Sequence, residues 1–348
     1  MRSVSGLIGA LAIVLAVSCC TSGAGTKQEG SNIVSLTTEV FSIKGNDTLR
    51  IDFFEDRSKV AHKGETPVLL YIHGGGFTAG DRVNAAQEIF CRYFAERGWI
   101  AASIDYRLAG ITYGEDGQVV NPYGVDGTLS AIRYATADAI DATNHILKTR
   151  ADEINPTKVC LAGGSADAIA ALQLVYDTCN GEDYTLGLPE GFEYAGLISQ
   201  AGCIATMEDA LIWKKSPCPM MLFHGDIDGV VPLSEGKIDC NLFGTLYIEE
   251  HLKEMEVPYW KWIEKGADHV MAMKPLTTYL EEQYRFLNDF VVNGIKSTVI
   301  TEVQDKEPAS MASVEEMTRF VPFYILGYGK YLDQIDWGNL DNPTKVVY

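Results

Sequence analysis

Hydrophobic and polar positions follow two different patterns along this chain, and each pattern predicts a different kind of element. Near the start, residues 34–43 and 48–54 alternate apolar with polar side chains around Gly45-Asn46-Asp47, which is typical of a β-hairpin. Six later segments are predominantly apolar, as strands buried on both faces are: 68–72, 99–104, 158–162, 194–199, 219–223 and 259–263. Five of these runs precede segments with helical periodicity: 83–97, 126–149, 166–177, 243–255 and 275–293.

Apolar strands that alternate with helices predict an α/β fold with a mostly parallel, twisted sheet and helices on both faces. The hairpin at the start adds antiparallel strands and makes the sheet mixed. Ligands bind such sheets at the carboxyl ends of the strands. The segments that directly follow the apolar runs are therefore the places to look for chemistry.

Composition narrows the choice of partner. The chain has 348 residues, of which 28 are basic and 47 acidic, so its formal net charge is −19. Nucleic-acid binding requires clustered Lys and Arg, and attraction to anionic lipid requires positive charge. The sequence therefore argues against both, while the net charge does not name a substrate.

The N-terminal segment has the features of an export signal over residues 1–18. Its apolar run, residues 6–17, is shorter than the roughly 20 residues that span a bilayer. Ser18 and Cys19 then resemble the cleavage site of bacterial lipoproteins, in which the first mature cysteine is acylated. This resemblance implies a membrane-anchored protein that faces the periplasm or the cell surface, with residues 19–33 as a tether. Ordinary cleavage that leaves the cysteine unmodified is the alternative.

Cysteine spacing offers no metal site. Export permits disulfides, but no C-x-x-C pair or neighbouring histidine pair accompanies the remaining cysteines, and the sequence assigns no pairing. Beyond the adjacent pair Cys19 and Cys20, the remaining cysteines are Cys91, Cys160, Cys179, Cys203, Cys218 and Cys240. We expect neither a metal nor an organic cofactor.

A candidate nucleophile follows the third apolar run. Ser165 comes directly after Gly163 and Gly164, and a helical pattern begins at Ala166. A serine on such a strand-to-helix turn is a nucleophile elbow: the bend raises the hydroxyl above the sheet, and the free amides of the helix start can bind an anion. The alternative is a Gly-Ser turn that only caps the helix.

The first apolar run ends in a glycine triplet. Gly74, Gly75 and Gly76 follow His73, so backbone amides can approach a ligand oxygen without interference from side chains. This pattern predicts an oxyanion hole, in which each donor contributes about 100- to 1,000-fold in rate. The Lys and Ser or Thr of a phosphate-binding P-loop are missing. The alternative is an ordinary turn.

A serine nucleophile requires a base and a residue that orients the base. In α/β enzymes of this kind the order along the chain is Ser, acid, His. His269 follows the sixth apolar run and fits the base by its position. Asp226 and Asp228 both follow the fifth run, and their spacing alone does not choose between them.

Together these motifs resemble the α/β-hydrolase fold. Within it they resemble carboxylesterases with an HGG-type oxyanion loop, of the hormone-sensitive-lipase-like and bacterial feruloyl or acetyl esterase-like groups. The resemblance covers about residues 35–295 and rests on these segments: 71–81 (YIHGGGFTAGD), 103–108 (SIDYRL), 161–168 (LAGGSADA), 224–232 (HGDIDGVVP) and 266–270 (GADHV). It implies that Asp228 is the acid, and that the amides of Gly75, Gly76 and Ala166 form the oxyanion hole.

One position departs from the family pattern. The elbow of the family is G-x-S-x-G, and Asp167 stands where the last glycine belongs. An acidic residue suits the first turn of a helix, but an anion near the oxyanion would oppose the charge that develops there. We therefore expect the side chain to point away from the hole and the activity to be modest.

These observations predict a hydrolase domain over residues 34–296 and a C-terminal extension, 297–348, packed against it. We expect the walls of the substrate pocket to come from loops 107–124, 179–193 and 201–217. The expected function is that of a serine carboxylesterase acting on small-molecule or glycan-linked esters, with acetyl or feruloyl esters of glycans as candidates. The alternatives are a serine peptidase of the prolyl-oligopeptidase type and a non-catalytic binding protein with the same fold.

Overall fold

The computed structural model describes residues 34–60, 64–110, 112–113, 119–120, 127–305 and 310. The expected signal peptide, Cys19, the tether and residues 311–348 of the C-terminal extension lie outside the described residues, so what was expected of them stays a prediction. Among the residues that are described, no helix combines the length and hydrophobicity needed to cross a bilayer.

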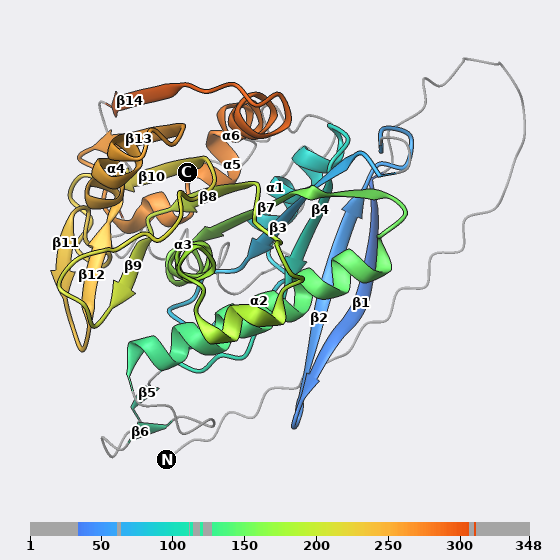
Figure 1. Cartoon of the computed structure of the whole chain (residues 1–348), viewed down its shortest axis with the longest axis horizontal. Helices are drawn as coiled ribbons and strands as arrows, with labels where there is room; N and C mark the ends of the chain where they lie inside the picture. The colour runs from blue at the N-terminus through green and yellow to red at the C-terminus, as the bar shows by residue number, and fades with distance from the viewer. Residues whose placement is uncertain are drawn as a thin grey trace, which may run out of the picture. The chain divides into compact units, whose positions relative to one another are not determined.

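A nine-stranded sheet forms the centre of the described structure, in the order β1-β2-β4-β3-β7-β8-β10-β13-β14 (Figure 1). Its strands are β1 (Ser35–Lys44), β2 (Asp47–Glu55), β3 (Thr66–Ile72), β4 (Ile100–Ile104), β7 (Ile154–Gly164), β8 (Gly196–Gln200), β10 (Met220–Gly225), β13 (Tyr259–Lys265) and β14 (Thr298–Gln304).

The sheet is mixed, as the sequence predicts. β1 pairs with β2, and β2 with β4, in antiparallel register, while from β4 onward in the sheet order each strand pairs in parallel with the next. Each of the six apolar runs forms a strand: β3, β4, β7, β8, β10 and β13. Their side chains are buried on both faces because helices cover both sides of the sheet.

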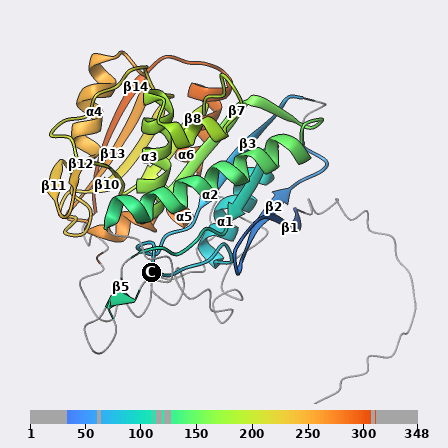
Figure 2. The ribbon, with the colours of Figure 1, turned by 60° about the horizontal axis from the view of Figure 1, so that its bottom comes forward.

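Helices α2, α3 and α4 pack on one face of the sheet, and α1, α5 and α6 on the other (Figure 2). Asn84 caps α1 with its side chain, and α3 begins one residue after β7 ends. The bounds are α1 (Ala85–Ala95), α2 (Thr128–Thr149), α3 (Ala166–Asn180), α4 (Thr245–Glu254), α5 (Pro275–Thr278) and α6 (Leu280–Phe286), with short helical turns η1 (Asp183–Gly187), η2 (His269–Ala272) and η3 (Leu287–Val292).

The last expected helix is not continuous. Residues 275–293 divide into α5, α6 and η3, and the last of these is a π-helical turn. The backbone at Tyr279 leaves helical geometry, with φ −116° and ψ 41°, and this residue separates α5 from α6. An apolar periodicity can therefore survive a break in the helix, because it reports only which side chains face the sheet.

Two features were not expected from the sequence. β14 lies beyond residue 296 and pairs with β13, so the sheet takes its edge strand from the segment expected to be an extension. A second, three-stranded sheet contains β11 (Glu235–Lys237), β12 (Asn241–Gly244) and β9 (Cys203–Thr206), and a short ladder joins β5 (Thr112–Tyr113) to β6 (Val119–Val120). β14 and β9 pair with strands that are far away in the sequence. The strands of the two small sheets contain only two to four residues, so they carry little periodic signal.

Candidate active site

Ser165 occupies the sharp turn between β7 and α3. Its φ of 60° and ψ of −127° are unusual for a residue other than glycine. The turn is held because the Ser165 amide donates to the Gln200 carbonyl at 2.9 Å, and the Ser165 carbonyl accepts from the Ile169 amide at 3.0 Å. This conformation raises the hydroxyl above the carboxyl end of the sheet, as expected of an elbow.

Both glycines before Ser165 are required by close backbone packing. A Cβ at Gly163 would lie 2.6 Å from the backbone carbonyl of Asp167 in the first turn of α3. A Cβ at Gly164 would collide with the carbonyl oxygen of Ala272 in η2. The two glycines therefore let both the elbow helix and the histidine-bearing segment approach the end of β7.

A chain of two hydrogen bonds links the predicted nucleophile, base and acid. Ser165 Oγ lies 2.8 Å from His269 Nε2, and His269 Nδ1 lies 2.8 Å from Asp228 Oδ2. Asp228 and His269 come from the segments after β10 and β13, whose parallel strands end at the same edge of the sheet. This geometry suits proton transfer from the hydroxyl to an imidazole that a carboxylate orients.

Asp228, and not Asp226, contacts the imidazole. The other Asp228 oxygen accepts hydrogen bonds from the amides of Val230 and Val231 at 2.8 and 2.9 Å. Burial alone would raise the pKa of Asp228, but the hydrogen bond and charge of His269 and these two amides lower it below its usual value. Asp226 instead accepts from the Gly266 amide and supports the turn after β13.

His224 lies beside the Asp228 carboxylate and makes no hydrogen bond to Ser165. Its Nδ1 lies 2.9 Å from Thr245 Oγ1, and its Nε2 lies 3.1 Å from the Val231 carbonyl oxygen and 3.5 Å from the Asp228 carboxylate. Burial lowers the pKa of this histidine, so we expect its neutral form near pH 7. The sequence placed His224 at a strand end but gave no signal of this supporting contact.

The segment that carries His269 is tied down by a buried ion pair. The Lys274 ammonium lies 2.7 Å and 2.9 Å from the two oxygens of Glu264, and the Tyr279 hydroxyl donates to the same carboxylate at 2.9 Å. Lys274 also lies 3.0 Å from Asp305, which follows β14. The residues after the last strand thus help to fix the position of the base.

The glycine loop lies beside the elbow. Gly75 and Gly76 have φ values of 144° and 64°, and a Cβ at Gly75 would collide with the Ala79 carbonyl. Within the described part of the chain, the amides of Gly75, Gly76 and Ala166 are paired with no hydrogen-bond acceptor. Ala166 is the first residue of α3, where helix amides are free. These three amides are the candidate oxyanion donors.

Asp167 is buried beneath this loop and does not line the cavity above Ser165. A Cβ at Gly74 would lie 3.5 Å from Asp167 Oδ2, which shows how close the carboxyl and the loop are. Neither carboxyl oxygen has a well-formed hydrogen bond among the described residues. Burial raises the pKa of Asp167 well above its usual value, and the nearby Tyr106 hydroxyl opposes this only in part. Burial therefore favours the neutral form of this carboxyl.

His73 braces the same loop. Its ring stacks on Tyr106 with centroids 4.4 Å apart, and its Nδ1 lies 3.1 Å from the Gly74 carbonyl oxygen. Burial lowers the pKa of His73, which favours a neutral, structural imidazole.

A cavity of about 310 Å³ opens above Ser165 and His269. Its walls come from the end of β3 and the glycine loop, the start of α1, the elbow, the loop after β10 and the segment that begins at His269. No described residue of 107–124, 179–193 or 201–217 lines it, so the expectation for the pocket walls was wrong for the described parts of these loops. Helix α1 and the segment before α5 instead fold over the strand ends and enclose the serine.

Sequence reasoning missed two polar residues of this cavity, Asn84 and Gln87. They lie at the start of α1, and only the tertiary packing of α1 brings them over the serine. The helix-capping position of Asn84 was the one available signal, and it indicates a helix start, not a binding site.

The described residues contain no group of His, Cys, Asp or Glu side chains arranged to hold a metal ion. The six described cysteines are free thiols, four of them buried.

Comparison with known proteins agrees with this architecture. A family model described as BD-FAE matches residues 57–181, which include the glycine loop and Ser165. Gut esterase 1 of Caenorhabditis elegans is 25% identical over 152 residues, which are 43% of this chain and 25% of that protein. Gut esterase 1 of Caenorhabditis briggsae is 29% identical over 101 residues, which are 28% of this chain and 17% of that protein. The chain thus matches a quarter or less of the length of these relatives.

Solved structures resemble the chain over a larger part. Thermogutta terrifontis esterase 2, phosphorylated by paraoxon, superposes with a TM-score of 0.53 at 20% identity, covering 73% of this chain and 94% of that one. An α/β-hydrolase enzyme from a Medee basin deep-sea metagenome library gives a TM-score of 0.50 at 16% identity, covering 75% and 99%. The chain thus has the α/β-hydrolase fold of these solved structures, and the family model and the esterase relatives are similar to it over part of its length.

Proposed function

We propose that this protein is a serine carboxylesterase that works through an acyl-enzyme. The observation that carries the proposal is the continuous chain of 2.8 Å contacts from Ser165 through His269 to Asp228, with the serine on a strained elbow at the mouth of a cavity. A serine that only capped α3 would need neither the imidazole nor the positive φ, and its side chain makes no capping hydrogen bond.

In the proposed reaction, Ser165 Oγ attacks the ester carbonyl carbon while His269 Nε2 takes the hydroxyl proton. The amides of Gly75, Gly76 and Ala166 donate to the oxyanion of the tetrahedral intermediate. His269 returns the proton to the departing alkoxide, which leaves as the alcohol. Water then attacks the acyl-enzyme with the same imidazole as base, and the carboxylic acid leaves. Asp228 stabilises the imidazolium in both halves.

Acetyl or feruloyl esters of glycans are the proposed natural substrates, as the sequence resemblance implies. Short acyl groups are supported by Thermogutta terrifontis esterase 2, whose structures include propionate-bound and butyrate-bound forms. The form phosphorylated by paraoxon supports a nucleophilic residue in that relative. In this chain, a cavity of about 310 Å³ has room for a short or aromatic acyl group.

The test combines active-site labelling with a substrate panel. A fluorophosphonate probe is expected to label the wild type at Ser165 and not Ser165→Ala, while Ser216→Ala, a change at an exposed serine, keeps the labelling. The panel contains short p-nitrophenyl esters, acetylated and feruloylated oligosaccharides, and aminoacyl anilides.

We expect Ser165→Ala to lose at least 1,000-fold in kcat on the esters. If the variant retained more than a tenth of wild-type kcat, the proposed nucleophile would be wrong. Faster cleavage of the anilides than of any ester would favour a peptidase. A correctly folded wild type that neither reacts with the probe nor cleaves any ester would favour the non-catalytic binding protein.

A further inference from the structure

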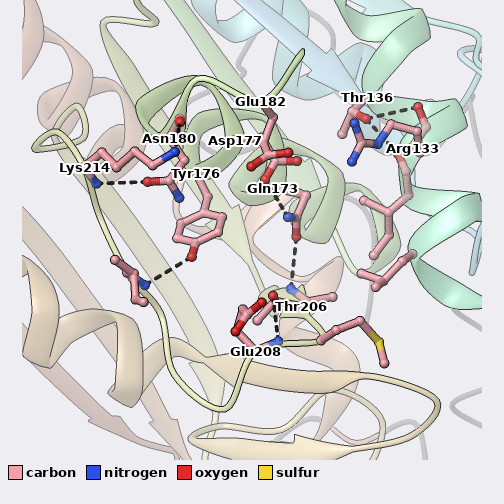
Figure 3. Close-up of a pocket in the computed structure, with 15 residues that line it drawn as sticks. Arg133, Thr136, Gln173, Tyr176, Asp177, Asn180, Glu182, Thr206, Glu208 and Lys214 are labelled. Carbon is pink, nitrogen blue, oxygen red and sulfur yellow. Dashed lines mark hydrogen bonds between the residues drawn. The ribbon is translucent and has the colours of Figure 1, made fainter. Parts of the chain in front are cut away.

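Buried glutamine side chains bridge separate elements at two places in the described structure. One of them is Gln173, at a cavity of about 540 Å³ between α2, α3 and residues 205–214 (Figure 3). Its Nε2 donates to Asp177 at 2.9 Å, and its Oε1 accepts from the Ala205 amide at 3.0 Å. These bonds tie α3 to β9 and involve no residue of the triad, so Gln173 is a structural brace.

The second place joins Gln200, the last residue of β8, to Gln283 in α6, and neither side chain is exposed. Gln200 Nε2 donates to Gln283 Oε1 at 2.8 Å. Gln283 Nε2 in turn donates to the carbonyl oxygens of Pro275, at 2.7 Å, and Tyr279, at 2.9 Å. The side-chain amide of Gln283 therefore bridges the end of β8 to the first residue of α5 and to the residue that follows α5.

Gln200 lies against the turn that carries the nucleophile. Its carbonyl accepts from the Ser165 amide at 2.9 Å, and in the pairing of β7 with β8 it stands opposite Gly164. Its side chain lies at the same place, because a Cβ at Gly164 would come within 3.3 Å of Gln200 Oε1. A change in the position of Gln200 would therefore move the elbow as well.

The other end of the bridge lies on the segment that carries the base. Pro275 begins α5, and the short turn η2, which starts at His269, precedes it. The connection between them is stiff, because the amides of Met273 and Lys274 both donate to the Val270 carbonyl at 2.9 Å. A shift of the Pro275 carbonyl would therefore displace His269.

Two braces thus act on this segment from different sides. The ion pair of Lys274 with Glu264 ties it to β13, the strand that precedes it, whereas Gln283 ties it to β8, beside the nucleophile. Of the two, the second spans the distance between the elements of the base and the nucleophile. Loss of the Gln283 amide leaves the ion pair in place, so we expect the segment to stay folded but to shift relative to Ser165.

Small shifts between these two segments matter for proton transfer. Ser165 Oγ lies 2.8 Å from His269 Nε2, within the roughly 2.6–3.2 Å over which a base can take the proton. A misplacement of about 1 Å can cost about 100-fold in rate. Gln283 forms three bonds at once, two as a donor and one as an acceptor, which an amide can do and a carboxylate or a thioether cannot.

We propose that Gln283 is a positioning residue, which acts through Gln200 to hold the segment of His269 at proton-transfer distance from Ser165. Gln283 is not among the residues that line the cavity, so it acts through its neighbours and not on the substrate. This inference rests on the proposed esterase function and adds to it the residues that align the nucleophile with the base.

The test measures kcat and KM on p-nitrophenyl acetate for variants in which methionine replaces a buried glutamine. Methionine keeps the length of the side chain but cannot donate a hydrogen bond. Gln283→Met is expected to lower kcat about 10- to 100-fold while KM changes less than about 3-fold, because the same base serves both halves of the reaction. Gln173→Met, which removes a buried bridge that does not involve the triad, is the matched control and is expected to keep kcat within about 3-fold.

Further measurements separate positioning from loss of the fold. The thermal transition of each variant is recorded, and kcat is expressed per site that the fluorophosphonate probe labels at completion, so that unfolded molecules do not count. Gln200→Met breaks the bridge at its other end and leaves the Gln283 donors on Pro275 and Tyr279, so it carries the test if Gln283→Met does not fold. The double variant is expected to lose no more in kcat than the worse single variant, because both changes break one bridge.

The inference is overturned if neither Gln200→Met nor Gln283→Met lowers kcat by more than the control does, or if their effect is on KM alone. Losses that multiply in the double variant would also overturn it, since independent sites behave in that way. Failure of the proposed function gives a different result, because then the wild type cleaves no ester and does not react with the fluorophosphonate probe.

Discussion

Replacing Asp167 with asparagine separates the neutral from the ionised form of the elbow carboxyl. The side chain has no exposed surface and lies directly beneath the glycine loop. Asparagine has nearly the same shape and carries no charge at any pH. If the wild-type carboxyl is held as the neutral acid, the variant mimics the native state, and the two proteins differ mainly in how their stability changes with pH.

The sign of this change follows from the raised pKa of Asp167. In the unfolded chain the carboxyl loses its proton near pH 3.9, whereas the folded protein keeps it to much higher pH. Each pH unit between the two pKa values changes the free energy of unfolding by about 1.4 kcal/mol. Between these two pKa values the folded state binds the extra proton, so the free energy of unfolding falls as pH rises. Asp167→Asn lacks this loss. Its advantage over the wild type should grow by roughly 2.7 kcal/mol between pH 5.5 and 7.5 while the folded carboxyl stays protonated.

Guanidinium unfolding of both proteins at half-unit steps from pH 5.5 to 8.5 measures this difference. All other titrating groups are shared, so they cancel when one curve is subtracted from the other. A constant offset between the curves is compatible with the reasoning, because an amide and an acid differ slightly in how well they pack at the same position. A difference that does not change with pH would refute it, since it would mean that the folded carboxyl ionises normally.

Two further predictions concern the acid and the elbow. Asp228→Asn should lower kcat on a p-nitrophenyl ester about 1,000- to 10,000-fold, whereas Asp226→Asn, whose amide oxygen can still accept from the Gly266 backbone amide outside the triad, should stay within about 10-fold; equal losses would contradict the assignment. Gly164→Ala should cost about 1–3 kcal/mol of unfolding free energy and lower kcat, because its Cβ would collide with the Ala272 carbonyl. Gly229→Ala, with no atom within 4 Å of its Cβ, is the matched control and should change the unfolding free energy by less than about 0.5 kcal/mol.

The parallel strands and the order of the motifs were predictable because their signals are local. An apolar run such as residues 68–72 must be buried on both faces, and a serine between Gly164 and a helix start has few other conformations available. β14 escaped prediction because it is an edge strand with alternate residues exposed, and the periodicity of residues 275–293 hid the break at Tyr279.

The residues of the candidate site also divide into those that local signals predict and those that they leave open. Chain order and strand ends single out Ser165 and His269, because parallel strands bring their carboxyl ends to one edge of the sheet. The two candidates for the acid, Asp226 and Asp228, lie two positions apart in one loop. Spacing alone left it open, the family resemblance favoured Asp228, and the structure brings the Asp228 carboxylate within 2.8 Å of the imidazole.

The sequence by itself determined the α/β architecture, the elbow, the glycine loop and the candidate base, since each depends on residue types within a few positions of one another. Only the tertiary structure decided what surrounds them. Burial favours the neutral form of Asp167, and the packing of α1 brings Asn84 and Gln87 to the wall of the cavity that Ser165 also lines. Both features depend on contacts between segments that are distant in sequence. A local sequence pattern does not predict which surfaces these contacts will bury.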